Sequence, residues 1–173
     1  MFREMRRRRQ QLSPEECKRI LAEGTSGVLA LGGDEGYPYA VPLSYVYEEG
    51  RLFFHGAAAG HRRDAVLRDP KASFCVIGGD RVVPEEYTTY FRSVIVFGKI
   101  RILEEEAEKR SAIEKLAEKY SPPAGRWPPA GDRPGIFSPV HDGADRGAHD
   151  GQASGGTYAR KAVRARGRGI TAA

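Results

Sequence analysis

The stretch that decides the fold is Arg51-Leu-Phe-Phe-His-Gly-Ala-Ala-Ala-Gly-His-Arg-Arg-Asp-Ala-Val-Leu67. Its apolar run ends at His55, and a loop of small residues then leads into a segment that begins at His61 and carries Arg62 and Arg63. Backbone N–H groups at a helix start, the helix dipole and a forked guanidinium all favour a phosphate, and glycine lets the backbone come close to it. The pattern therefore predicts a strand, a phosphate-binding turn and a helix.

The sequence on either side alternates apolar runs with tight turns. Ser13, Pro14 and Glu16 form a helix start with a capping box, and the helix should run to about Ala22 and stop at Gly24. Strands are expected at Thr25–Leu31, Tyr37–Tyr47, Arg51–His55, Ala72–Ile77 and Thr88–Leu103, and further helices at His61–Arg68 and Glu104–Lys119. Short turns between successive strands predict an antiparallel sheet that is closed or nearly closed into a barrel.

Composition limits the class of protein. A chain of 173 residues can bury one core. The net charge of +5 lies mainly in the run Arg6–Arg9 and in the C-terminal part, because residues 1–121 carry 20 basic and 19 acidic side chains. Two distant cysteines, Cys17 and Cys75, predict free thiols in a reducing compartment. Neither a membrane-spanning run nor a secretory signal is expected, which favours a cytoplasmic protein.

The composition changes at Pro122. Residues 122–173 contain neither Leu nor Glu, and they hold ten of the 21 glycines and six of the 11 prolines. Such a segment cannot bury enough apolar surface to offset the entropy of ordering it. The sequence therefore predicts a domain at 1–121 and a disordered tail at 122–173.

Four motifs resemble one family. Residues 36–46, 54–62, 72–76 and 88–100, together with the N-terminal Met-Phe-Arg-Glu-Met-Arg, resemble the nitroimidazole-resistance (Nim) branch of the pyridoxamine 5′-phosphate oxidase-like FMN-binding split barrels. The resemblance covers residues 1–121. It implies a mainly β fold with flanking helices, a split β-barrel, and a homodimer with FMN at the subunit interface.

The resemblance also implies site residues. Those on the phosphate side are Gly60, His61 and Arg62. Those facing the isoalloxazine ring are Val41, Pro42 and Leu43. Those near the polar edge of the ring, helped by the partner subunit, are Thr89, Arg92 and Ser93. His55 is the candidate for the catalytic, substrate-side role and also borders the cofactor. No metal site is expected.

Simpler interpretations of these side chains stay open. His55 could be a strand-end histidine that is hydrogen-bonded to backbone, and His61 could be an exposed residue at the start of a helix. Arg92 could be a cross-strand ion-pair partner.

The implied function is that of a flavin-dependent oxidoreductase. NADH or NADPH would reduce FMN, and electrons would pass to a small acceptor such as a nitroaromatic. Alternatives within the fold are a non-catalytic flavin-binding protein and a pyridoxamine-phosphate-oxidase-like or haem-related protein. The run Arg6–Arg9 suggests a second class of function, a protein that binds nucleic acid or an anionic surface. Against this class, the run lacks interleaved aromatics and the rest of the domain is nearly neutral. We therefore expect a small-molecule substrate, no nucleic acid and no membrane.

The tail departs from the family, whose members continue with a final strand and a Met-Thr-Gly-Lys-Glu-Ala signature. Read one base later, the possible codons of His149 to Ser154 can encode Met-Thr-Gly-Lys-Gln-Ala, and the shift also permits the missing strand upstream. We hypothesise that the reading frame changes between about Ser121 and Gly135. A nucleotide sequence unable to encode the shifted peptide would contradict this. A real shift in the protein predicts a lost core strand and an unpaired sheet edge.

Overall fold

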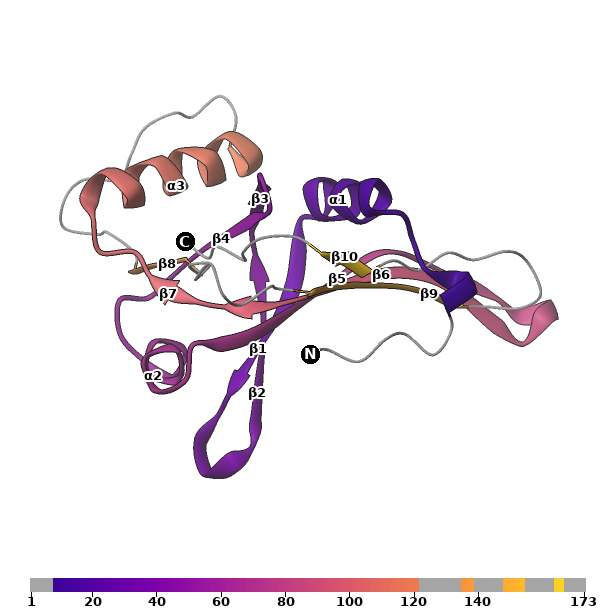
Figure 1. Ribbon diagram of the computed structural model, residues 1–173, viewed down its shortest axis with the longest axis horizontal. Coiled ribbons are helices and arrows are strands. Elements are labelled where there is room, and N and C mark those ends of the chain that lie inside the picture. Colours follow the sequence, from indigo (N-terminus) through magenta and orange to yellow (C-terminus); the bar gives the residue numbers. More distant parts are fainter. Residues whose placement is uncertain (1–7, 122–134, 139–147, 155–163, 167–173) are drawn as a thin grey trace.

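Figure 1 shows the computed structural model, which describes residues 8–121, 135–138, 148–154 and 164–166, the last three ranges as backbone. The helices are α1 (Pro14–Glu23), α2 (His61–Arg68) and α3 (Glu106–Tyr120), with 3-10 turns η1 (Arg8–Gln10), η2 (Asp34–Gly36) and η3 (Pro84–Glu86). The strands before residue 122 are β1 (Ser26–Gly32), β2 (Pro38–Ser44), β3 (Val46–Glu48), β4 (Arg51–Gly56), β5 (Lys71–Val83), β6 (Thr88–Lys99) and β7 (Arg101–Ile102). Those after it are β8 (Gly135–Ser138), β9 (Ala148–Ser154) and β10 (Arg164–Arg166).

Two antiparallel sheets form the body. Their strand orders are β10-β9-β6-β5-β1-β2 and β3-β4-β8-β7. The chain passes from one sheet to the other between β2 and β3 at Tyr45 and between β6 and β7 at Ile100, and both side chains are fully buried. The split β-barrel expected from the sequence is confirmed.

The core lies between the sheets and α1. The Ser13 hydroxyl accepts from the Glu16 N–H at 3.1 Å, and the Glu16 carboxylate accepts from the Ser13 N–H at 3.0 Å, so the predicted capping box is present. Helix α1 buries Ile20 and Leu21 in the same cluster as Phe74 of β5. Full burial of each such side chain contributes about 1.5–3 kcal/mol.

The C-terminal end of α3 is tied to the body. The Tyr45 N–H donates to the Tyr120 hydroxyl at 3.0 Å, and this hydroxyl lies 2.5 Å from the carbonyl oxygen of Thr25 and 2.7 Å from that of Tyr45. The Lys119 ammonium donates to the Gly24 carbonyl at 2.6 Å, and burial lowers the pKa of this lysine. These contacts join segments that lie 75 and 95 residues apart in the sequence.

Three strand predictions need correction. The run Tyr37–Tyr47 is split at Tyr45, because its hydroxyl donates to the Leu21 carbonyl at 2.7 Å and draws the ring into the core. The strand expected at Ala72–Ile77 continues as β5 to Val83, because β6 pairs with it along that length. The strand expected at Thr88–Leu103 is interrupted at Ile100, whose N–H donates to the Pro70 carbonyl at 2.7 Å.

The tail also differs from the expectation where it is described. Strand β8 pairs with β4 and β7, and β9 pairs with β6, so these edges are covered. Backbone pairing needs no particular side chain, so a glycine-rich sequence can satisfy a sheet edge. The other residues after 121 lie outside the described ranges, as do Arg6 and Arg7, so the domain boundary and the function of the basic run stay predictions.

Candidate functional site

The turn between β4 and α2 presents an open helix start. Gly60 precedes the helix with φ +115°, a conformation that side chains rarely adopt, and no heavy atom lies within 4 Å of the position a Cβ would take. Its backbone carbonyl accepts from the Asp64 N–H at 3.2 Å, which closes the first helical turn. The N–H groups of this turn point out of the helix, where the dipole favours an anion.

The side chain of Arg62 closes one side of this turn. A Cβ built on Gly56 would lie 1.0 Å from Arg62 Nη2, so the guanidinium occupies the space of the missing side chain. Nη2 also approaches the His55 carbonyl oxygen at 3.4 Å. Burial lowers the pKa of Arg62, although the group stays charged at neutral pH. A half-buried guanidinium beside an open helix start fits the phosphate of a flavin nucleotide.

His55 borders the same turn from the end of β4. Burial is the larger cause that lowers its pKa, and the charge of Arg62 lowers it further. The residue as a whole is nevertheless exposed. A neutral imidazole of this kind can donate an N–H or accept a proton at neutral pH.

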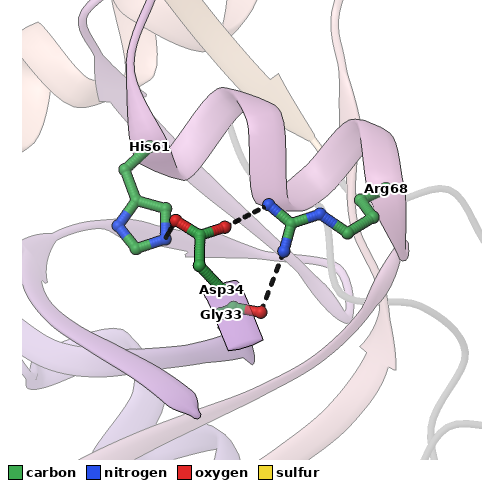
Figure 2. A network of polar contacts seen from close by, with 4 residues as sticks. All are labelled: Gly33, Asp34, His61 and Arg68. Carbon is green, nitrogen blue, oxygen red and sulfur yellow. Dashed lines mark hydrogen bonds and ion pairs between the residues drawn. The ribbon is translucent and has the colours of Figure 1, made fainter. Parts of the chain in front are cut away.

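Figure 2 shows that the side chain of His61 turns to the β1–β2 turn. Its Nε2 lies 3.4 Å from Oδ2 of Asp34, and its ring stacks on Tyr39 of β2 at a centroid distance of 4.1 Å. Arg68 donates to Oδ1 of the same carboxylate at 2.6 Å. Asp34 and Tyr39 were missed in the sequence, because turn aspartates and strand tyrosines carry no signal for a contact with a distant helix.

The three residues expected at the flavin ring lie on both faces of β2. Val41 and Leu43 pack against the core on the face of Tyr39, whereas Pro42 is exposed on the opposite face. The sequence placed them together as neighbours, but strand alternation separates them.

The structure does not bring the third group to α2 within one chain. Thr89 and Ser93 pair with Val82 and Ile77 on the ribbon of β5 and β6, which extends away from α2 (Figure 1). At about 3.3 Å per residue, Val82 lies roughly 35 Å along β5 from the strand start beside α2. Arg92 lies near Glu16 of α1: the hydrogen bond from the Ser13 backbone is the main cause that lowers the pKa of Glu16, and the charge of Arg92 lowers it further.

The described ranges offer neither a metal site nor a membrane-spanning helix. Within these ranges, no cluster of three or more His, Cys, Asp or Glu side chains could hold a metal ion. None of the described helices has the length and apolar character needed to cross a membrane.

Comparisons with known proteins agree with the split-barrel fold. A family model described as pyridoxamine 5′-phosphate oxidase matches residues 13–135, so the chain belongs to this family. No curated protein matches the sequence.

Solved structures share the fold at low identity. A candidate 5-nitroimidazole antibiotic resistance protein from Bacteroides thetaiotaomicron is 21% identical with a TM-score of 0.65, over 82% of this chain and 85% of that one. An FAD-binding protein from Mesorhizobium loti is 20% identical with a TM-score of 0.57, over 83% and 96%. An FAD- and haem-binding protein from Mycobacterium smegmatis is 18% identical with a TM-score of 0.65, over 86% and 74%.

Proposed function

We propose that this protein binds FMN between the start of α2 and the face of β2 that carries Val41 and Leu43, and that it is an FMN-dependent oxidoreductase. The observation that carries the proposal is the guanidinium of Arg62, which is held in the space beside Gly56 at an open helix start. Family membership and the flavoprotein names of structural neighbours support the same cofactor class.

Each part of the chain has a role in this proposal. The α2 N–H groups and Arg62 bind the phosphate, and the apolar side chains of β2 line one side of the ring. When bound, FMN would supply the redox chemistry between a reduced nicotinamide, NADH or NADPH, and a small acceptor, with nitroaromatics as the class to test first. His55 stays neutral beside Arg62 and can give or take a proton at a ring nitrogen on the substrate side.

The proposed site needs a second copy of the chain. Thr89 pairs with Val82 far along the ribbon from α2, and Arg92 lies on the same ribbon, so a partner subunit would supply these two residues at the polar edge of the ring. Ser93 is buried within its own subunit, so we do not assign it to the partner's flavin. The sheet offers a surface for that partner. Pro42, Val28, Cys75 and Ile95 lie side by side across four strands on the face opposite Leu29 and Phe74; we call this row the outer face. Val28, one of the two inner residues of this row, is 42% exposed, and exposed apolar patches mark protein interfaces.

Flavin titration tests the proposal. Wild-type protein should bind FMN more tightly than riboflavin, which lacks the phosphate. Arg62→Ala should weaken FMN binding by about tenfold or more, the value of a charge-assisted hydrogen bond, while riboflavin binding stays unchanged. Arg110→Ala, which removes an arginine from the exposed face of α3, is the matched control. Equal FMN affinity of wild type and Arg62→Ala would contradict the site.

Turnover is tested on the flavin-loaded protein without oxygen. NADH or NADPH should bleach the flavin absorbance, and a nitroimidazole should restore it. Bound flavin that neither nicotinamide reduces would instead identify a non-catalytic flavin-binding protein.

A further inference from the structure

We propose that Asp34 is a positioning residue of the flavin site, which it serves by fixing helix α2 against the β1–β2 turn. This inference rests on the proposed function. The Asp34 network consists of Asp34, Gly33, His61 and Arg68 (Figure 2), and none of its side chains has to touch the flavin.

One carboxylate contacts both ends of the helix. Oδ2 of Asp34 lies 3.4 Å from His61 Nε2, and Oδ1 accepts from Arg68 Nη2 at 2.6 Å. Seven residues make almost two helical turns, so His61 and Arg68 lie on one face of α2. Arg68 Nη1 also donates to the Gly33 carbonyl at 2.8 Å, so its guanidinium spans the turn.

The turn that presents the carboxylate is itself well fixed. The Gly33 N–H donates to the Tyr37 carbonyl at 2.8 Å, and the Tyr37 N–H donates to the Asp34 carbonyl at 2.9 Å. Glu35 has φ 52°, a left-handed conformation that tightens the reversal. Tyr39, which follows in β2, stacks on His61, so strand and turn hold the helix together.

Helix α2 needs this support because it has few apolar anchors. Of its eight residues, only Ala65 and Val66 are buried. The Asp34 network therefore fixes the rotation and tilt of the helix, and with them the place of Arg62 relative to Val41 of β2. This relation sets the distance between the phosphate contact and the ring contact of the proposed site.

The effect of the Asp34 network on the orientation of α2 can be separated from its effect on the stability of the fold. The side chains of Asp34 and Arg68 are 65% and 48% exposed, so their ion pair contributes little to global stability. A loss of helix orientation should weaken FMN, which uses both contacts, more than riboflavin, which uses the ring contact alone. A merely structural role would weaken both in equal proportion.

The experiment compares FMN and riboflavin dissociation constants of the full-length protein. Asp34→Asn and Arg68→Gln should each reduce the preference for FMN over riboflavin about three- to fivefold, the scale of one exposed ion pair. The fold-change of the double variant should be smaller than the product of the two single fold-changes, because both changes break the Asp34–Arg68 ion pair. Glu118→Gln, at an exposed carboxylate of α3, is the control.

The outcomes separate this inference from the proposed function. The positioning role alone is overturned if wild type prefers FMN but the variants keep that preference. It is also overturned if the variants lose affinity for FMN and riboflavin in equal proportion. Wild-type protein that binds neither flavin overturns the proposed function and the positioning role with it. Amide exchange of flavin-free protein adds an independent readout: Asp34→Asn should speed exchange in α2, and unchanged exchange would show that the network does not hold the helix.

Discussion

The guanidinium of Arg62 lies in the space that a side chain at Gly56 would fill, with Nη2 1.0 Å from the position of a Cβ. Because the last residue of β4 lacks a side chain, an arginine from the first turn of α2 can fold back against the strand. This relationship brings a cation, an open helix start and His55 to one place, and the proposed flavin site depends on it.

Gly56→Ala tests this relationship. The new methyl group would displace the end of a flexible side chain rather than backbone, so the fold should persist while Arg62 moves. We expect FMN affinity to fall about tenfold, with riboflavin affinity unchanged and a small shift of the unfolding midpoint. The check is flavin fluorescence titration beside thermal denaturation. Gly32→Ala, where a Cβ would meet no atom within 4 Å, is the control.

His55 should make stability depend on pH. Its pKa is lower in the folded protein than its ordinary value of 6.5, through burial and the charge of Arg62. The unfolded chain therefore binds the proton more readily, so this contribution to stability is complete above about pH 6.5 and is lost as pH falls through the lowered pKa. The urea midpoint of wild type relative to His55→Gln should fall on acidification from about pH 7 to pH 5. Parallel pH profiles would refute this effect.

The outer face should hold the dimer together. Val28 lies between Pro42 and Cys75 in the row that ends at Ile95, so Val28→Lys places a charge where two copies would meet. We expect light scattering to give a dimeric mass for wild type and a monomeric mass for Val28→Lys, which should also bind flavin more weakly. Leu67→Lys changes an exposed leucine of α2 and controls for solubility. A dimeric Val28→Lys would place the interface elsewhere.

The Tyr120 hydroxyl should stabilise the body. It accepts from the Tyr45 N–H and lies within hydrogen-bond distance of the carbonyls of Thr25 and Tyr45. Tyr120→Phe leaves these backbone groups without that partner, and we expect a loss of about 1–3 kcal/mol in the free energy of unfolding. Tyr87→Phe, at a side chain that is 99% exposed, should change it little. Equal denaturation curves for the two variants would show that the hydroxyl contributes nothing.

Local signals in the sequence were enough to predict most helices and strands. The cap at Ser13, the glycine-bounded turn before β2 and the small-residue loop before α2 each act over a few residues, and each element formed as expected. The break at Tyr45 could not be predicted, because it depends on a hydrogen bond to Leu21, which is distant in the sequence.

In the candidate site, too, the features set by nearby residues were predictable and those set by contacts between distant segments were not. The placement of His55, Gly60 and Arg62 around one turn follows from their closeness in the sequence. The Asp34 network and the distance of Thr89 from α2 arise from the packing of separate elements, and no local pattern encodes them. The tail strands were missed because backbone pairing at a sheet edge does not require the periodicity that sequence analysis detects.

The most direct test of the flavin site is the visible absorption spectrum of the purified full-length protein, after FMN is added and the excess removed by gel filtration. We predict flavin bands that elute with the wild-type protein and are largely lost from Arg62→Ala. A folded wild-type protein that elutes without flavin bands would contradict it.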